Sequence, residues 1–107
     1  MPYVIKVTKN DKFSFSLKAM NHEIILTSQI HGTKAAALAG IASVQKHGPD
    51  EANFELKKSS SDQPYFILKA ANHQTIGTSE MYSSEAAARN GIASVQKNSS
   101  STDIKEA

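Results

Sequence analysis

Residues Phe15–His47 read FSLKAMNHEIILTSQIHGTKAAALAGIASVQKH, and residues Phe66–Asn98 read FILKAANHQTIGTSEMYSSEAAARNGIASVQKN. Aligned without gaps, 19 of these 33 positions are identical, at a constant spacing of 51 residues. The register also extends backwards, where the aligned pairs are Tyr3 with Phe54, Ile5 with Leu56 and Lys6 with Lys57. An internal repeat of this kind indicates one structural unit built twice.

The repeat sets the expected organisation of the chain. A length of 107 residues is typical of one domain. We place the first unit at about residues 3–50 and the second at about residues 54–98. The linker between residues 47 and 53 is too short to separate two independent domains. The serine-rich segment 99–107 is expected to be a polar tail.

Each unit predicts three strands followed by a helix. Tyr3–Val7 alternates as a half-buried strand does, and Phe13, Phe15 and Leu17 form the inner side of a second strand. The third strand is predicted to turn Ile25 and Thr27 inwards. The helices are expected to start after Thr33 and Ser84, whose hydroxyls suit an N-cap. Apolar residues then recur on one helix face, at Ala37, Ile41 and Val44 and at Ala88, Ile92 and Val95.

The second and third strands of each unit flank Asn21-His22 and Asn72-His73. A two-residue hairpin needs both central residues at positive φ, and this usually selects Asn-Gly. Histidine is one of the few other residues enriched at positive φ. We therefore predict tight hairpins here and assign His22 and His73 to turn positions.

The two units are expected to share one interior. A three-stranded sheet with one helix leaves its strand edges open. Two such units can join around a pseudo-two-fold axis. The prediction is an α+β fold with one antiparallel sheet and both helices on the same face.

The sequence resembles the YegP-like family of small bacterial and archaeal proteins. The resemblance spans residues 3–98 and is most specific at Gly91–Lys97, which reads GIASVQK after Tyr82-Ser83-Ser84. It implies tandem βββα repeats in a single sheet, with strands exchanged between the units, and a short edge strand over residues 102–105. It implies no activity. The chain departs from the family pattern at His22 and His73, where the family has glycine, and at His31-Gly32, where it has Tyr-Ser.

Composition narrows the classes of partner. The net charge is +2, and the twelve Lys and Arg residues form no cluster of three, whereas a phosphate-binding face needs several cations on one surface. No apolar run is long enough to cross a bilayer, and Lys6 interrupts any signal-peptide pattern. The absence of cysteine excludes a disulfide scaffold. We expect a cytoplasmic protein.

No motif in the sequence predicts catalysis or a bound cofactor. No serine lies in a G-x-S-x-G or S-x-x-K setting. The four histidines, at positions 22, 31, 47 and 73, show no H-x-x-x-H spacing, and cysteine ligands are absent. Neither helix start has the glycine-rich loop of a phosphate cradle. We therefore expect no enzymatic activity, no metal and no cofactor.

The most informative surface is the sheet face away from the helices. Alternation places apolar side chains there, where water is expected: Ile24 with Leu26, and Tyr65 with Ile67. Lys18 and Lys69 lie on the same face. Scattered exposed apolar residues are common, but this set is also consistent with a contact surface for a protein partner or a second copy. The alternative is weak nucleic-acid binding through Lys6, Lys18, Lys57 and Lys69.

Overall fold

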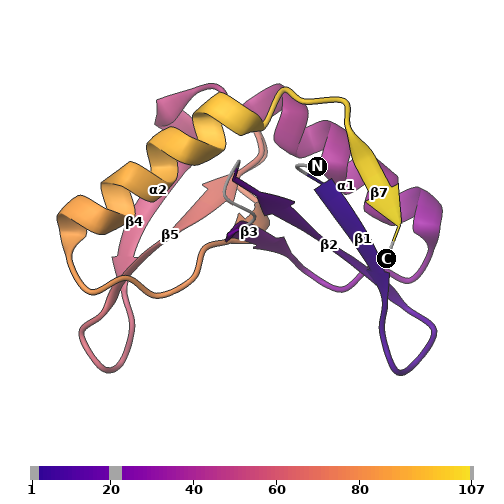
Figure 1. Ribbon diagram of the computed structural model, residues 1–107, viewed down its shortest axis with the longest axis horizontal. Coiled ribbons are helices and arrows are strands. Elements are labelled where there is room, and N and C mark those ends of the chain that lie inside the picture. Colours follow the sequence, from indigo (N-terminus) through magenta and orange to yellow (C-terminus); the bar gives the residue numbers. More distant parts are fainter. Residues whose placement is uncertain (1–2, 20–22, 107) are drawn as a thin grey trace.

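The computed structural model describes residues 3–19 and 23–106. Figure 1 shows one twisted sheet with two helices lying over the same face. The strands are β1 (Tyr3–Val7), β2 (Phe13–Lys18), β3 (Ile24–Ser28), β4 (Phe54–Lys58), β5 (Pro64–Lys69), β6 (Thr75–Thr78) and β7 (Ile104–Glu106). The helices are α1 (Lys34–His47), α2 (Glu85–Asn98) and the 3₁₀ turn η1 (Glu51–Asn53).

The sheet has the order β4-β5-β6-β3-β2-β1-β7. The predicted α+β duplication with both helices on one face is confirmed. One pair differs from the prediction, because β7 runs parallel to β1 and makes the sheet mixed. The three strands of each unit stay together, so the expected strand exchange is limited to β7, which follows the second unit but pairs with the first.

The two units meet at the centre of the sheet through β3 and β6. These strands are antiparallel, with Thr27 opposite Thr78. The two threonines are 51 residues apart and therefore occupy the same position of the repeat. A pseudo-two-fold axis consequently passes through this pair.

Both helices begin as the sequence predicts. The Thr33 side chain accepts a hydrogen bond from the Ala36 amide, and Ser84 accepts one from the Ala87 amide. α1 contacts β2 but also β5 and β6, and α2 contacts β5 but also β2 and β3. Each helix therefore covers strands of both units, and the two units share one core. No helix of the described chain is long and apolar enough to span a membrane.

The start of α1 follows the second unit despite its different sequence. The His31 ring stacks on Phe15 with ring centroids 6.1 Å apart, as Tyr82 stacks on Phe66 at 6.1 Å. Histidine thus provides the flat surface that tyrosine provides in the other copy. Both rings lie beneath a helical glycine, Gly40 or Gly91.

The hairpin loops differ from the two-residue prediction. At the β5–β6 loop the His73 amide donates to the Ala70 carbonyl, and the Ala70 amide donates to the Gln74 carbonyl. Only His73 has a positive φ, of 66°. This is a three-residue loop, a type I turn closed by one left-handed residue. Asp11 and Asp62 play the same part in the β1–β2 and β4–β5 loops. Asn21 and His22 lie outside the described residues.

Candidate functional site on the concave face of the sheet

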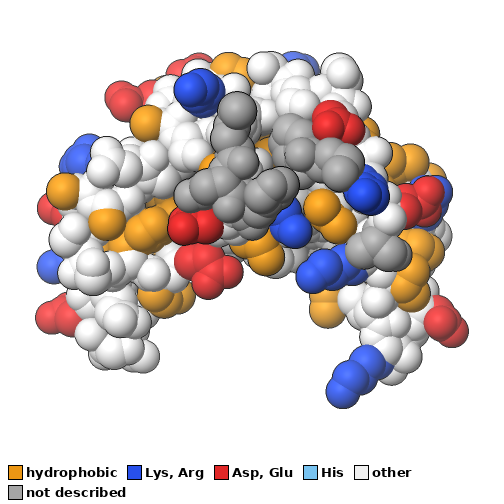
Figure 2. Space-filling model, viewed as in Figure 1, with side chains coloured by type: hydrophobic (Ala, Val, Ile, Leu, Met, Phe, Trp, Pro, Cys, Tyr) orange, Lys and Arg blue, Asp and Glu red, His pale blue; other side chains and the backbone are white. Residues whose placement is uncertain are grey.

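The sheet face away from the helices is concave. Figure 2 shows the molecule hollowed on its underside, between the tips of the β1–β2 and β4–β5 hairpins. One row of outward-facing side chains crosses the six antiparallel strands: Val4, Ser16, Thr27, Thr78, Ile67 and Glu55. We refer to this surface as the concave face.

The prediction for Leu26 is wrong. It pairs with Leu17, and its side chain lies in the helix-facing core with 1% exposure. A β-bulge between Leu17 and Lys18 adds one residue to β3, so that Ile25 and Leu26 both face inwards. The bulge also reverses Thr27, which pairs with Ser16 and is exposed on the concave face.

The other apolar candidates do not form an exposed patch. Ile67 lies on the concave face but is only 7% exposed, and Ile24 and Tyr65 are half-buried. The exposed large apolar side chains lie elsewhere. Ile30 is 64% and Met81 48% exposed, at equivalent positions just before each helix start. The sequence did contain this signal, because an apolar residue recurs there at the 51-residue spacing.

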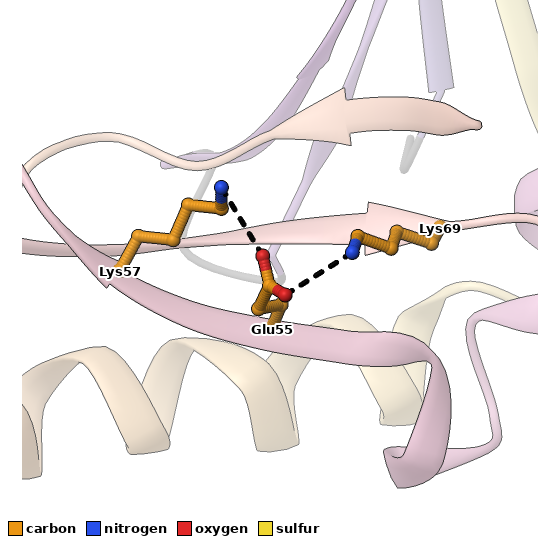
Figure 3. A network of polar contacts seen from close by, with 3 residues as sticks. All are labelled: Glu55, Lys57 and Lys69. Atoms are coloured by element: carbon orange, nitrogen blue, oxygen red, sulfur yellow. Dashed lines mark hydrogen bonds and ion pairs between the residues drawn. The ribbon is translucent and has the colours of Figure 1, made fainter. Parts of the chain in front are cut away.

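The second unit carries a closed charge network on this face. Lys57 and Lys69 reach Glu55 from either side, with nitrogen–oxygen distances of 3.2 and 3.1 Å (Figure 3). The hydrogen bonds from Lys69 and then Lys57 lower the pKa of the Glu55 carboxyl below its ordinary value. Glu55 therefore lies between the two lysines and compensates one of their two charges within the protein.

The first unit lacks this network. Val4 occupies the position of Glu55, so the equivalent lysines, Lys6 and Lys18, have no carboxylate between them. Neither makes an ion pair with any residue in the described ranges. Ser16 lies between them on the same face, and its buried hydroxyl has no hydrogen-bond partner there. A buried hydroxyl left unpaired costs about 1–3 kcal/mol.

This arrangement can bind an anionic group. Two cations on one face without a carboxylate between them suit a carboxylate or another anionic group. Among the described residues, no three or more His, Asp or Glu side chains come close enough to hold a metal ion. His31 lies in the helix-facing layer against Phe15, and His73 lies in the β5–β6 loop, so neither joins the row on the concave face.

Comparison with known families supports the duplication. The profile of a domain of unknown function, DUF1508, matches the chain twice, over residues 8–55 and 59–106. The two matches start 51 residues apart, which is the period of the repeat. Each match begins in the loop after the first strand of a unit and ends in the strand that follows the helix.

The chain is also similar to curated proteins and solved structures. It is 57% identical over 104 residues to the UPF0339 protein YegP of Yersinia pestis, covering 97% of this chain and 93% of that protein. A solution NMR structure of a UPF0339 protein from Shewanella oneidensis is 51% identical with a TM-score of 0.91, covering 99% of this chain and 92% of that one. The NMR structure of Escherichia coli yegP, described as a protein of unknown function, is 43% identical with a TM-score of 0.92, covering 97% and 90%.

Proposed function

Since the chain belongs to the DUF1508 family, whose function is unknown, we propose that it is a non-enzymatic binding module. In this proposal the concave face of the first unit binds an acidic segment of a partner protein. The observation that carries it is that Lys6 and Lys18 have no carboxylate partner among the described residues, whereas the equivalent Lys57 and Lys69 share Glu55. A carboxylate of the partner would lie between Lys6 and Lys18, as Glu55 lies between Lys57 and Lys69.

The difference in charge pairing between the two units favours an acidic partner. The repeat keeps a lysine pair in each half, but only the second half places a carboxylate, Glu55, between the two lysines. An acidic partner would complete in the first unit the charge pattern that the second unit completes internally. We further propose a cytoplasmic location, which the absence of cysteine supports.

Nucleic-acid binding through the four lysines is less well supported. Lys57 and Lys69 are already bound to Glu55, which compensates one of the four lysine charges. Recognition of single-stranded RNA on a sheet also uses several stacked aromatic side chains. Of the described residues that face outwards from these strands, Tyr65 alone is aromatic.

The test is affinity capture from native lysate with three forms of the chain: the wild type, Lys6→Gln/Lys18→Gln, and the control Lys46→Gln/Lys97→Gln. The control removes the same two charges from equivalent positions on the two helices. We expect a protein that is captured by the wild type and the control and is lost with Lys6→Gln/Lys18→Gln.

Two results would count against the proposal. Equal capture by both double variants would show that the concave face is not the binding surface. Capture that disappears after nuclease treatment and falls steeply with salt would identify a nucleic acid as the ligand.

A further inference from the structure

The last strand, β7, brings a lysine onto the concave face. β7 pairs in parallel with β1, and Lys105 lies directly beside Val4. Residues paired across neighbouring strands point to the same face of a sheet. Because Val4 belongs to the row on the concave face, Lys105 extends this row by one strand. Glu106, one position further, is turned to the helix side, where its carboxylate lies 2.6 Å from the Lys34 nitrogen of α1.

Lys105 joins the lysine pair of the first unit. Lys6 follows Val4 by two positions on β1 and shares its face, and Lys18 extends over this face from β2, as its equivalent Lys69 does in the second unit. Three lysines therefore surround one uncharged residue. Within the described ranges, no carboxylate forms an ion pair with any of the three.

The second unit shows which group fits between such lysines. There Glu55 replaces valine, and its carboxylate lies 3.2 Å from the Lys57 nitrogen and 3.1 Å from the Lys69 nitrogen. The first unit has one lysine more and no carboxylate at this position. A single carboxylate would compensate only one of its three positive charges. Two or more neighbouring carboxylates match this site better than one.

We propose, on the basis of the function proposed above, that Lys105 is a third binding residue for the acidic segment and that β7 couples its own docking to binding. The segment carries at least two neighbouring carboxylates. It reaches Lys105 at this place only while β7 is docked on β1. By linkage, the bound segment must stabilise the docked strand, and loosening of β7 must weaken binding by the same factor.

β7 is held lightly enough for such coupling. Its three residues are all exposed. Outside the strand pairing, Gln45 donates to the Ser101 carbonyl at 2.8 Å, and the ion pair between Lys34 and Glu106 is exposed. Exposed ion pairs contribute little to stability, and segments with few buried contacts open locally at a low free energy. Figure 1 shows β7 at the margin of the sheet, beside β1.

The first test uses hexaglutamate, a peptide of adjacent carboxylates, titrated into the isotope-labelled full-length protein and followed by NMR. We expect saturable shifts at amides of β1, β2 and β7, and slower hydrogen exchange at the β7 amides. Lys105→Gln should weaken binding about threefold. The control Lys97→Gln removes the same charge from α2, on the other side of the sheet, and should have a much smaller effect because distant exposed charges are screened.

A second variant tests the coupling without changing any charge. Ile104→Gly removes the apolar side chain of β7 and should loosen the strand. We expect faster hydrogen exchange at the β7 amides and about twofold weaker binding of hexaglutamate. Attraction by net charge alone predicts no change. Ile30→Gly is the matched control, since Ile30 is exposed and lies outside β7, just before the start of α1.

The outcomes separate this proposal from the function on which it rests. If Lys6→Gln/Lys18→Gln abolishes binding while Lys105→Gln and Ile104→Gly bind like the wild type, the concave face remains the site and the role of β7 is wrong. The absence of saturable shifts on β1, β2 and β7 would remove the three-lysine site, whereas the capture experiment decides the proposed function independently. Tighter binding of inorganic tripolyphosphate than of hexaglutamate would assign the lysines to phosphate groups and overturn the acidic segment.

Discussion

At the scale of single residues, Gly91 shows how a missing side chain positions a helix. A Cβ atom built at this position would lie 2.9 Å from a ring carbon of Phe66 and would also clash with Tyr82. Gly40 lies over Phe15 in the same way, with a distance of 2.8 Å. The helices can therefore approach the aromatic layer only because both copies keep glycine here.

We expect Gly91→Ala to lower the free energy of unfolding by up to about 2 kcal/mol. Overpacking against the rings costs about 1–3 kcal/mol and outweighs the gain in helix propensity of about 1 kcal/mol. Gly32→Ala is the control, because a Cβ there meets nothing within 4 Å. Urea unfolding would measure both. A Gly91→Ala protein as stable as the control would show that the rings yield without cost.

At the scale of elements, the three-residue loop places the strain of each described hairpin on one residue. In the β5–β6 loop this is His73, whose left-handed conformation disfavours a side chain. Asn72, one position earlier, has no positive φ, and its side-chain oxygen accepts from the Gln74 amide at 3.1 Å. Glycine should consequently have opposite effects at these two positions.

His73→Gly is expected to raise the free energy of unfolding by about 0.5–1 kcal/mol, because glycine adopts positive φ without steric cost. Asn72→Gly should lower it by a similar amount, since a hydrogen bond is lost and the unfolded chain gains freedom. Thermal unfolding measures both as shifts of about 4–8 °C per kcal/mol in the midpoint. Destabilisation by both variants would argue against strain at His73.

The elements also show what the sequence could predict. Internal identity located two helices and six strands, and the N-caps at Thr33 and Ser84 followed from local chemistry. The bulge in β3 did not follow, because strict alternation assigns Ile24 and Leu26 to one face. Only the pairing with β2 inserts the extra residue that sends Leu26 inwards. Burial of Ile67 likewise depends on how the sheet curves, which no local pattern encodes.

At the scale of the whole molecule, Tyr3 links the start of the chain to the end of α2. Its ring is fully buried, and its hydroxyl donates to the Ser99 carbonyl at 2.5 Å. Ser99 caps α2, and a Cβ at Gly48, which caps α1, would lie 2.6 Å from the Ser99 hydroxyl oxygen. The two helix ends and β1 therefore meet at one buried junction.

This junction should make stability depend on pH in alkaline solution. Burial raises the pKa of Tyr3 above its ordinary value near 10. The unfolded chain therefore loses this proton first, and the stabilisation present below pH 10 declines as the pH rises. Between pH 10 and 11 the wild type should lose about 1 kcal/mol more than Tyr3→Phe. At neutral pH, Tyr3→Phe should be less stable by about 1–2 kcal/mol. Parallel urea-unfolding curves at the two alkaline pH values would contradict this assignment.

The chain's route through the repeats has a geometric consequence. After α1 the backbone must become the border strand β4 itself, so no following segment remains to lie against that border. After α2 the backbone does not have to form the first strand of another unit. It continues instead as β7, which pairs with β1. When two copies of one unit follow each other in a single chain, the outer sides of β1 and β4 therefore cannot both be covered by the segment that follows a helix. Within the described residues, the duplicated sheet therefore has one edge strand that is covered by β7 and one, β4, that is not.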